Sequence, residues 1–372
     1  MKQPSIINRV EDNGCLMFTL VNADSSLANS LRRYILSEIP VCCIRTETEA
    51  VNQCHIEINT SRLHNEILKQ RLSCIPIHST NLSLLPGKYQ LVVDVENTTD
   101  HVMYVTSEHF KVKQKQNQND EETVMDNYMS SDEVHSLFPP SKFGDYIDFV
   151  RLRPSWGDMP GERIKLTADF SVSNSKTNSM FNAVSKCSFS NTIDSKRVED
   201  TLEVKRKEWR SSGISDADIA FQERNFMLLD AHRLFVENSY DFIIESIGIY
   251  DNWTLVQMAI QGLVQQFKEF SMGIQLDKIS ILPVSSDTYE IILNDKDSTF
   301  GKLLEYALYT HSFLENKNLS FVSYLHSHPH STFSVVRIAP IVTEQTASPS
   351  ETNKKAILES SSMIIDTLLK LL

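Results

Sequence analysis

The stretch FTLVNADSSLANSLRRYIL, residues 18–36, has a counterpart near the other end of the chain, IILNDKDSTFGKLLEYAL, residues 291–308. When Asp24 is placed over Asp297, each copy runs from an alternating strand into an Asp-Ser helix start, where short polar side chains can accept hydrogen bonds from the first turn. Each helix then carries apolar residues at helical spacing, which predicts one buried face in both copies. The predicted core residues are Leu27, Leu31, Tyr34 and Ile35 in the first copy and Phe300, Leu304, Ala307 and Leu308 in the second.

The segments that follow the two helices also look alike. A β-rich run (41–58) follows the first helix, and a second one (319–338) follows the other, where two strand-like runs flank SYLHSHPHS (323–331) as in a hairpin. Each copy closes with an amphipathic helix, predicted at 253–270 and 355–372. Neither copy alone has enough core to cover its apolar faces, so we predict a pseudo-symmetric pair packed together in one chain. The alternative is two ordinary α+β domains with a chance similarity.

Composition limits the possible functions. A chain of 372 residues with 41% hydrophobic residues can form two or three domains. No apolar run approaches the roughly 20 residues of a membrane span, and the N-terminus lacks an apolar leader core, so an intracellular or virion-internal location is expected. The net charge of −12 argues against independent binding of nucleic acid. The six cysteines form no Cys-x-x-Cys pair, which favours free thiols over a zinc ribbon or a redox dithiol.

Three polar segments interrupt the pattern. Residues 113–141 are polar and acidic and contain Pro-Pro, which predicts a disordered surface insertion. Residues 194–218 are charged and are predicted to form a loop region with at most a short helix. Residues 342–355 are rich in Ser and Thr and contain a proline, so they are predicted to form a loop before the terminal helix.

Three histidines at alternate positions, His326, His328 and His330, raise the question of a zinc site. His-x-His-Pro resembles the start of the metal loop of deubiquitinase-type metalloproteases, which also needs a Ser and an Asp ligand further on. Val336 and Ala339 occupy those two positions here, so a catalytic zinc would lack ligands. We therefore predict a structural hairpin tip, with adventitious metal binding as the alternative. The sequence has only ten glycines and no glycine-rich loop that could bind phosphate. We therefore predict that the chain has no cofactor and no catalytic residues of its own.

The segment LHNEILKQRLSCIPI, residues 63–77, resembles a signature of the larger alpha-like assembly subunit of cellular RNA polymerases. Glu66, Arg71 and Pro76 match this signature, whereas Asn65 stands where the family usually has Asp. The segments SLANSLRRYILSEIP, YVTSEHF and DFIIESIGIY are similar to further parts of the same subunit, in the same order. The cysteine cluster that binds zinc or an iron-sulfur centre in some larger subunits is absent, so the resemblance implies no metal.

The C-terminal hundred residues resemble the smaller alpha-like subunit. DSTFGKLLEYAL is similar to that subunit's helix start, and Tyr324, His328 and Pro329 fit its Tyr-x-x-x-His-Pro hairpin. Both subunits joined in one chain resemble the arrangement in large cytoplasmic DNA viruses. The expected locations are therefore the host cytoplasm, in the viral factory, and the virion.

The resemblance implies an α+β fold with two dimerisation units that form an intramolecular pseudo-dimer. The first unit is expected at 1–78 and 237–272, an inserted mostly β domain at 79–236, and the second unit at 273–372.

The implied function is a non-catalytic assembly scaffold of a multisubunit DNA-dependent RNA polymerase. Its implied partners are the two largest polymerase subunits and small polymerase subunits, with no membrane, no independent nucleic-acid binding and no homodimer. Arg32 and Arg33 lie off the apolar stripe and are predicted to contact a partner subunit; Glu66 and Arg71 are predicted to be structural, with Arg71 pairing with Glu66 or capping the turn before Pro76. An interaction module derived from these subunits but acting outside the polymerase is the rival hypothesis.

Overall fold

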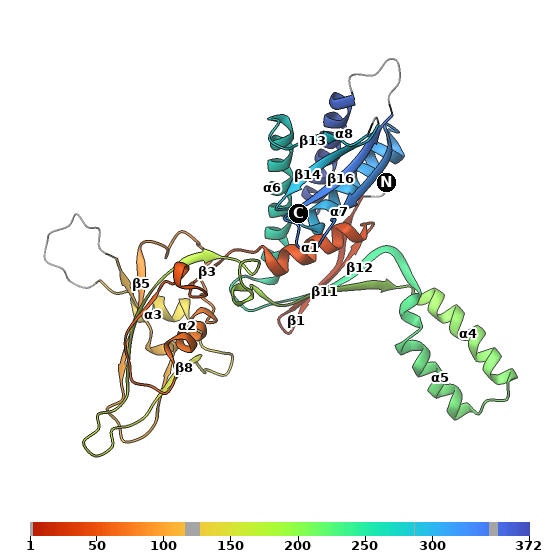
Figure 1. Cartoon of the computed structure of the whole chain (residues 1–372). Coiled ribbons are helices and arrows are strands. Elements are labelled where there is room, and N and C mark those ends of the chain that lie inside the picture. The colour runs from red at the N-terminus through yellow and green to blue at the C-terminus, as the bar shows by residue number, and fades with distance from the viewer. Residues whose placement is uncertain (1–2, 116–126, 286, 342–348) are drawn as a thin grey trace. The chain divides into compact units, whose positions relative to one another are not determined.

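A computed structural model describes residues 3–115, 127–285, 287–341 and 349–372 of the chain. The chain divides into two compact units (Figure 1). Unit 1 comprises Met1–Ile35, Lys186–Glu245 and Asn252–Leu372, and unit 2 comprises Leu36–Ser185 and Ser246–Asp251. None of the described helices is both long and apolar enough to cross a lipid bilayer.

The first repeat of unit 1 is a four-stranded antiparallel sheet with the order β1-β2-β12-β11. Phe18 on β2 lies opposite Phe242 on β12, and their rings stack with centroids 4.9 Å apart. Helix α1 follows β2, and helix α6 follows β12. The bounds are β1 Ser5–Asp12, β2 Cys15–Val21, α1 Ser25–Ser37, β11 Val184–Ile193, β12 Phe235–Ser246 and α6 Asn252–Gln275.

The second repeat has a sheet of the same kind, with the order β13-β14-β16-β15. Helix α7 follows β14 and continues into a π-helical segment, η5 (Leu308–Glu315), while helix α8 follows β16. Figure 1 shows α6 and α8 beside this sheet. The bounds are β13 Ile281–Pro283, β14 Tyr289–Asn294, α7 Ser298–Ala307, β15 Leu319–Leu325, β16 Phe333–Pro340 and α8 Pro349–Leu369. The two repeats therefore share one order of strands and helices.

This shared order corrects the predicted alignment of the repeats. The β15–β16 hairpin, which forms where it was expected, corresponds to β11–β12 and not to residues 41–58. Residues in that β-rich run instead form β3 (Val41–Cys43) and β4 (Cys54–Asn59), which pair with β10 (Ser171–Ser173) and β9 (Arg163–Asp169) in unit 2. The sequence comparison missed the true counterpart because about 150 residues separate α1 from β11.

The connection between β11 and β12 is helical, whereas a loop region was predicted for 194–218. Helices α4 (Ser195–Ser211) and α5 (Asp216–Leu228) form a hairpin, called here the arm, which extends away from the strands (Figure 1). The side chain of Asp194 accepts a hydrogen bond from Arg197 N at the start of α4. Buried apolar residues form a small core within the arm and the turn that follows it, despite the charged sequence; they are Val198, Leu202, Phe226 and Ala231.

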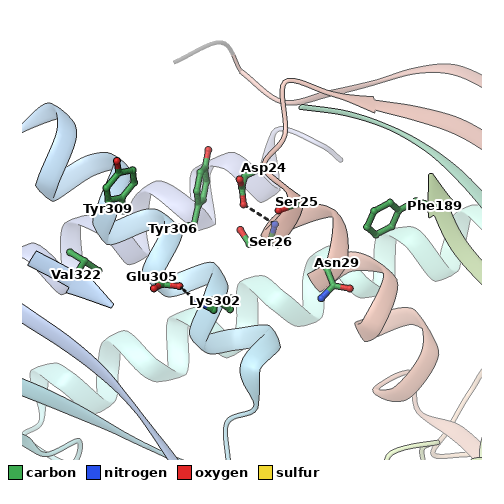
Figure 2. A pocket seen from close by; sticks show the side chains of 10 residues that line it. All are labelled: Asp24, Ser25, Ser26, Asn29, Phe189, Lys302, Glu305, Tyr306, Tyr309 and Val322. Carbon is green, nitrogen blue, oxygen red and sulfur yellow. Dashed lines mark hydrogen bonds and ion pairs between the residues drawn. The ribbon is translucent and has the colours of Figure 1, made fainter. Parts of the chain in front are cut away.

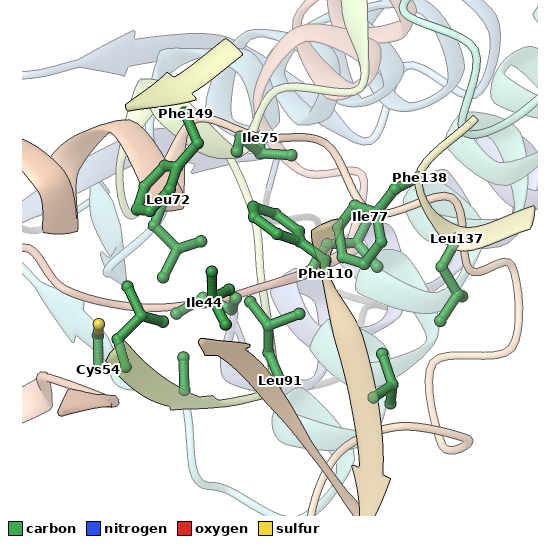
Figure 3. Close-up of a cluster of buried hydrophobic side chains, with 14 of the residues drawn as sticks. Ile44, Cys54, Leu72, Ile75, Ile77, Leu91, Phe110, Leu137, Phe138 and Phe149 are labelled. Carbon is green, nitrogen blue, oxygen red and sulfur yellow. The ribbon is translucent and has the colours of Figure 1, made fainter. Parts of the chain in front are cut away.

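Unit 2 is mostly β. Its main sheet has the order β4-β9-β5-β7, a second sheet pairs β6 with β8, and a third pairs β3 with β10. Figure 3 shows its core, where Phe149 lies close to Leu72 and Phe110 packs edge-on against Phe138. The remaining bounds are α2 Asn65–Ser73, β5 Tyr89–Glu96, β6 Met103–Thr106, β7 Lys111–Gln114, α3 Ser131–Leu137 and β8 Asp148–Leu152. Short 3₁₀ turns lie at Glu49–Val51, Ser107–His109, Ser179–Phe181 and Ala231–Arg233.

The bounds of unit 2 differ from the predicted inserted domain, 79–236, at both ends. Residues from 36 onward fold with unit 2 because β3 and β4 pair with its strands. Residues from 186 to 236 belong to unit 1 because β11 joins the sheet of the first repeat.

The disorder predicted for 113–141 does not extend to the described second half of that segment. Helix α3 begins with a capping box in which Ser130 and Glu133 exchange hydrogen bonds. Val134, Leu137 and Phe138 are buried in the core of unit 2. Residues 116–126 lie outside the described part of the chain.

Candidate partner-binding surface of unit 1

The two aligned aspartates begin the two central helices of unit 1. Asp24 Oδ1 accepts a hydrogen bond of 2.7 Å from Ser26 N, and Asp297 Oδ1 accepts one of 3.0 Å from Thr299 N. Each carboxylate thus satisfies a backbone donor of the first turn, where the helix dipole also favours negative charge. The sequence-based helix starts are correct at both positions.

The apolar stripes of both helices are buried in unit 1. In α1, Leu27, Leu31 and Ile35 are 3%, 1% and 1% exposed, and Tyr34 is half-buried. In α7 and the residue after it, Phe300, Leu304, Ala307 and Leu308 are at most 2% exposed. The Tyr34 ring packs so closely on Gly262 of α6 that a Cβ there would lie 1.9 Å from its hydroxyl oxygen.

Direct contacts join the two repeats inside unit 1. The rings of Phe267 on α6 and Phe300 on α7 stack with centroids 4.5 Å apart. Ser30 Oγ on α1 lies 3.3 Å from the carbonyl oxygen of Thr299, to which it donates a hydrogen bond. Helices α6 and α8 also pack against each other. The apolar faces of the two repeats therefore share one core.

The two arginines predicted to contact a partner lie on α1 and are half-buried. Arg33 forms an ion pair of 3.0 Å with Asp297, and both side chains remain more than 40% exposed. Arg32 donates to Asn29 Oδ1 at 2.6 Å and lies near Cys187. Burial raises the pKa of the Cys187 thiol to about 12, and the Arg32 charge offsets part of this effect. The partner contact of both arginines stays a prediction.

A pocket of about 560 Å³ opens beside these helix starts, and Figure 2 shows its lining. Each repeat contributes five of the ten lining residues. They are Asp24, Ser25, Ser26, Asn29 and Phe189 from the first repeat and Lys302, Glu305, Tyr306, Tyr309 and Val322 from the second. None of the ten is a histidine or a cysteine, so this lining offers neither the usual general base nor a thiol nucleophile.

The charged and phenolic groups of this pocket influence one another. Burial raises the pKa of Tyr306, and the nearby Asp24 carboxylate adds to the increase. Glu305 accepts hydrogen bonds from Lys302 Nζ at 2.6 Å and from Tyr324 N at 2.8 Å. The pocket therefore combines the side chains of Asp24, Glu305 and Lys302 with two phenol rings, a surface that suits a side chain of a partner protein.

The residues of the Tyr-x-x-x-His-Pro motif separate in the structure. The Tyr324 ring packs on Gly301 of α7, where a Cβ would lie 2.0 Å from the ring, so a larger residue at 301 would displace it. His328 and Pro329 are exposed at the tip of the hairpin. His328 Nδ1 accepts a hydrogen bond from His330 N at 3.1 Å, which is a local turn contact.

The described residues contain no group of three or more His, Cys, Asp or Glu side chains that could bind a metal ion. His326 Nε2 lies 3.1 Å from the backbone oxygen of Ser331, which is a local contact within the hairpin loop. Val336 is fully buried in β16, at a position where a metalloprotease would need its Ser.

The signature residues of the larger subunit lie in unit 2. Arg71 on α2 neither pairs with Glu66 nor caps the turn before Pro76, the two roles considered from sequence. It donates to Phe149 O at 2.8 Å and to Asp148 O at 2.7 Å. Arg71 therefore ties α2 to β8, while Glu66 is exposed and Pro76 lies between the buried Ile75 and Ile77.

Sequence reasoning missed several members of the unit 1 surface. Glu305, Tyr306 and Tyr309 were not singled out, although the first two align with Arg32 and Arg33 when Asp297 is placed over Asp24. The close approaches at Gly262 and Gly301 were also missed. A glycine inside a strongly apolar helix is a usable signal, because it costs helix stability unless another group needs the space.

Comparisons with known proteins identify the family of the chain. Residues 17–267, about two thirds of the chain, match the model of the RNA polymerase Rpb3/Rpb11 dimerisation domain. The chain belongs to this family. The matched range contains unit 2 and most of the first repeat, without β1 and the last residues of α6, and ends before the second repeat begins.

Several curated proteins are similar to parts of the chain. A conjugation stage-specific protein of Tetrahymena thermophila is 35% identical over 124 residues, which are 29% of this chain and 36% of that protein. The DNA-directed RNA polymerase II subunit RPB3 of Schizosaccharomyces pombe is 41% identical over 69 residues, 18% of this chain and 21% of that subunit. The human DNA-directed RNA polymerases I and III subunit RPAC1 is 40% identical over 68 residues, 18% of each chain. The chain thus spans about a third or less of these relatives.

Proposed function

We propose that this chain is a non-catalytic assembly subunit of a multisubunit DNA-dependent RNA polymerase. The two repeats act as an intramolecular pseudo-dimer, and their joint surface binds the two largest polymerase subunits, together with small polymerase subunits. Membership of the Rpb3/Rpb11 dimerisation family and the similarity to subunits RPB3 and RPAC1 support the proposal.

Two contacts between the repeats support the proposed pseudo-dimer. Arg33 of the first repeat pairs with Asp297 of the second at 3.0 Å. In the alignment of the repeats, Tyr306 corresponds to Arg33 and Asp24 corresponds to Asp297. Tyr306 and Asp24 line the same pocket (Figure 2), and the Asp24 charge acts on the Tyr306 phenol. Exchanging the repeats therefore maps one contact onto the other, as a two-fold relation requires of an isologous interface.

The joining of both repeats in one chain resembles the fused subunits of large cytoplasmic DNA viruses. Our proposal accordingly places the polymerase in a viral factory in the host cytoplasm and in the virion. Chain fusion raises the effective concentration of one repeat for the other and removes the need for a separate homodimer or heterodimer step.

Co-purification tests the assembly function. A tagged chain isolated from its native source should carry two large polymerase subunits in equal amount. Arg32→Ala/Arg33→Ala should leave the isolated chain folded, because both residues lie off the buried apolar stripe and the Arg33–Asp297 ion pair is exposed. If both arginines are interface hot spots, the double variant should lose roughly 2 kcal/mol of assembly free energy, about 30-fold in affinity.

The control is Arg224→Ala/Arg233→Ala, which removes two positive charges from exposed positions in and just after the arm. Unchanged recovery of the large subunits with this control, and reduced recovery with the α1 variant, would support the partner contact. Equal recovery from both variants would contradict it.

A polymerase-derived interaction module acting outside the polymerase is the second candidate. It is favoured by the similarity to the conjugation stage-specific protein of Tetrahymena thermophila, whose name mentions no polymerase. The same purification separates the two candidates, since the module would be recovered without large polymerase subunits.

A further inference from the structure

Unit 2 contains a second pocket, of about 330 Å³, between α2, β6 and β8. Three arginines line it: Arg62 in the turn before α2, Arg71 on α2 and Arg151 on β8. This is a local concentration of positive charge in a chain whose net charge is −12. Because such a cluster costs electrostatic free energy unless a counter-charge is present, it calls for an anionic partner.

The charges of these three arginines are not neutralised by the described part of the chain. Arg71 donates to two backbone carbonyls, which carry no net charge. Within the described residues, the side chains of Arg62 and Arg151 make no hydrogen bond or ion pair with any group.

Two acidic residues also line the pocket. Glu162 is engaged by Arg153, through the side-chain Nε at 2.6 Å and the backbone N at 2.7 Å. Asp148 is exposed and forms no ion pair with any described residue. The net charge of the residues that line the pocket is therefore positive.

The remaining walls of the pocket are apolar and aromatic. Tyr104 on β6 is 53% exposed, and Leu63, Phe149 and Val150 complete the lining. The planar fork of a guanidinium matches a carboxylate through two parallel hydrogen bonds, and an aromatic wall suits an apolar side chain beside it. The volume fits one or two side chains rather than a folded domain.

A nucleic acid fits this site less well than a peptide. Binding a polyanion requires a row of cations that follows the phosphates, whereas this pocket gathers three arginines in one place. We propose that the pocket of Arg62, Arg71 and Arg151 binds a short acidic segment of a partner protein, with Asp or Glu side chains on the arginines and an apolar residue on Tyr104. This site is separate from the unit 1 surface and does not depend on the proposed polymerase function.

Selection from a random peptide library tests the proposal without knowledge of the partner. Twelve-residue peptides displayed on phage are selected on the full-length chain and counter-selected on Arg62→Gln/Arg151→Gln. Since neither side chain forms a hydrogen bond or ion pair with a described residue, the variant should keep the wild-type melting temperature. Peptides that depend on the two arginines should be enriched in Asp and Glu and contain an apolar residue.

The affinity of the most enriched peptide is then measured by fluorescence anisotropy. We expect at least a 10-fold loss with Arg62→Gln/Arg151→Gln, a smaller loss with Arg62→Lys/Arg151→Lys, and a change below 2-fold with Lys111→Gln/Lys142→Gln, which removes two exposed charges elsewhere in unit 2. Higher salt should weaken binding.

Three results would overturn the proposal. The selected peptides could lack acidic enrichment, or bind the arginine variant as tightly as the wild type. Displacement of the peptide by twelve-residue oligothymidylate or by inorganic phosphate at lower concentration than by a second acidic peptide would instead assign the pocket to nucleic acid or to phosphate.

Discussion

The two repeats of unit 1 share their strand order and helix positions but differ in what is inserted between the same elements. After its first helix the first repeat carries the main segment of unit 2, Leu36–Ser185, whereas the second carries only the π-helical segment η5. In the first repeat the arm connects β11 to β12, whereas in the second repeat the short loop 326–332 connects β15 to β16. The common core thus fixes how the repeats meet, and the insertions make the surfaces of the two repeats different.

This difference has a physical basis in where insertions are tolerated. A connection at the surface can lengthen at a small entropic cost, since loop closure rises only slowly with length. A residue in the shared core has no such freedom, because interiors are close-packed.

The largest effect is expected at two aligned core positions, Leu31 and Leu304, which are 1% and 0% exposed. Leu31→Asp and Leu304→Asp each bury an unpaired carboxylate and should each lower the free energy of unfolding by roughly 3 kcal/mol or more. The measurement is urea unfolding, or the soluble fraction where the variant precipitates. If the repeats are equivalent, the two losses should be similar.

Leu314→Asp is the control, because this side chain in η5 is 50% exposed. It should change stability by less than about 0.5 kcal/mol. Wild-type stability of either core variant would mean that its repeat does not contribute to the shared core.

The helix starts and the buried helix faces of both repeats could be predicted from the sequence, because they depend on local patterns. Asp24 and Asp297 mark helix starts by their side-chain chemistry, and the apolar spacing that follows identifies the buried faces. The alignment of β15–β16 with β11–β12 could not be found in the same way, since strand pairing across unit 2 depends on contacts distant in sequence. The arm was missed for another reason: its buried residues, such as Val198 and Phe226, are few among many charges.

The candidate sites were predictable only in part. Arg32 and Arg33 stood out because they lie off an apolar stripe, but Asp297 as the partner of Arg33 could be identified only after the repeats were packed together. The arginine pocket of unit 2 was not visible at all, because Arg62 and Arg151 are far apart in sequence and meet only through folding.

A smaller effect is expected when the arm is removed. Its buried residues form a separate cluster within the arm, so replacing 194–234 by a seven-residue Gly-Ser loop should change the stability of the rest of unit 1 by about 1 kcal/mol or less. Thermal unfolding would measure this. Deleting 130–138 is the contrasting variant, because α3 buries Val134, Leu137 and Phe138 in the main core of unit 2.

The α3 deletion should cost several times more stability than the loss of the arm, since large apolar side chains leave a cavity behind them. A large loss on removal of the arm would show that the arm supports the first repeat. The two connections would then no longer be comparable surface insertions.

The smallest effects are expected at the two corresponding contacts between the repeats, Arg33–Asp297 and Tyr306–Asp24. A double-mutant cycle of Arg33→Gln and Asp297→Asn keeps the helix-cap oxygen at 297 and isolates the ion pair. Because both side chains are exposed, the coupling should be only about 0.2–1 kcal/mol and should shrink in high salt.

The related cycle combines Tyr306→Phe with Asp24→Asn. It removes the phenol hydroxyl in one variant and the nearby carboxylate charge in the other, and each change alone tolerates the existing packing. Since the carboxylate charge raises the pKa of Tyr306, spectrophotometric titration of the Asp24→Asn variant should show this pKa moving down towards its ordinary value. An unchanged titration curve would mean that the two groups do not interact, and the Arg33–Asp297 pair would then have no counterpart in the other direction. Because an isologous interface requires both contacts, the loss of one would leave two packed domains without a two-fold relation.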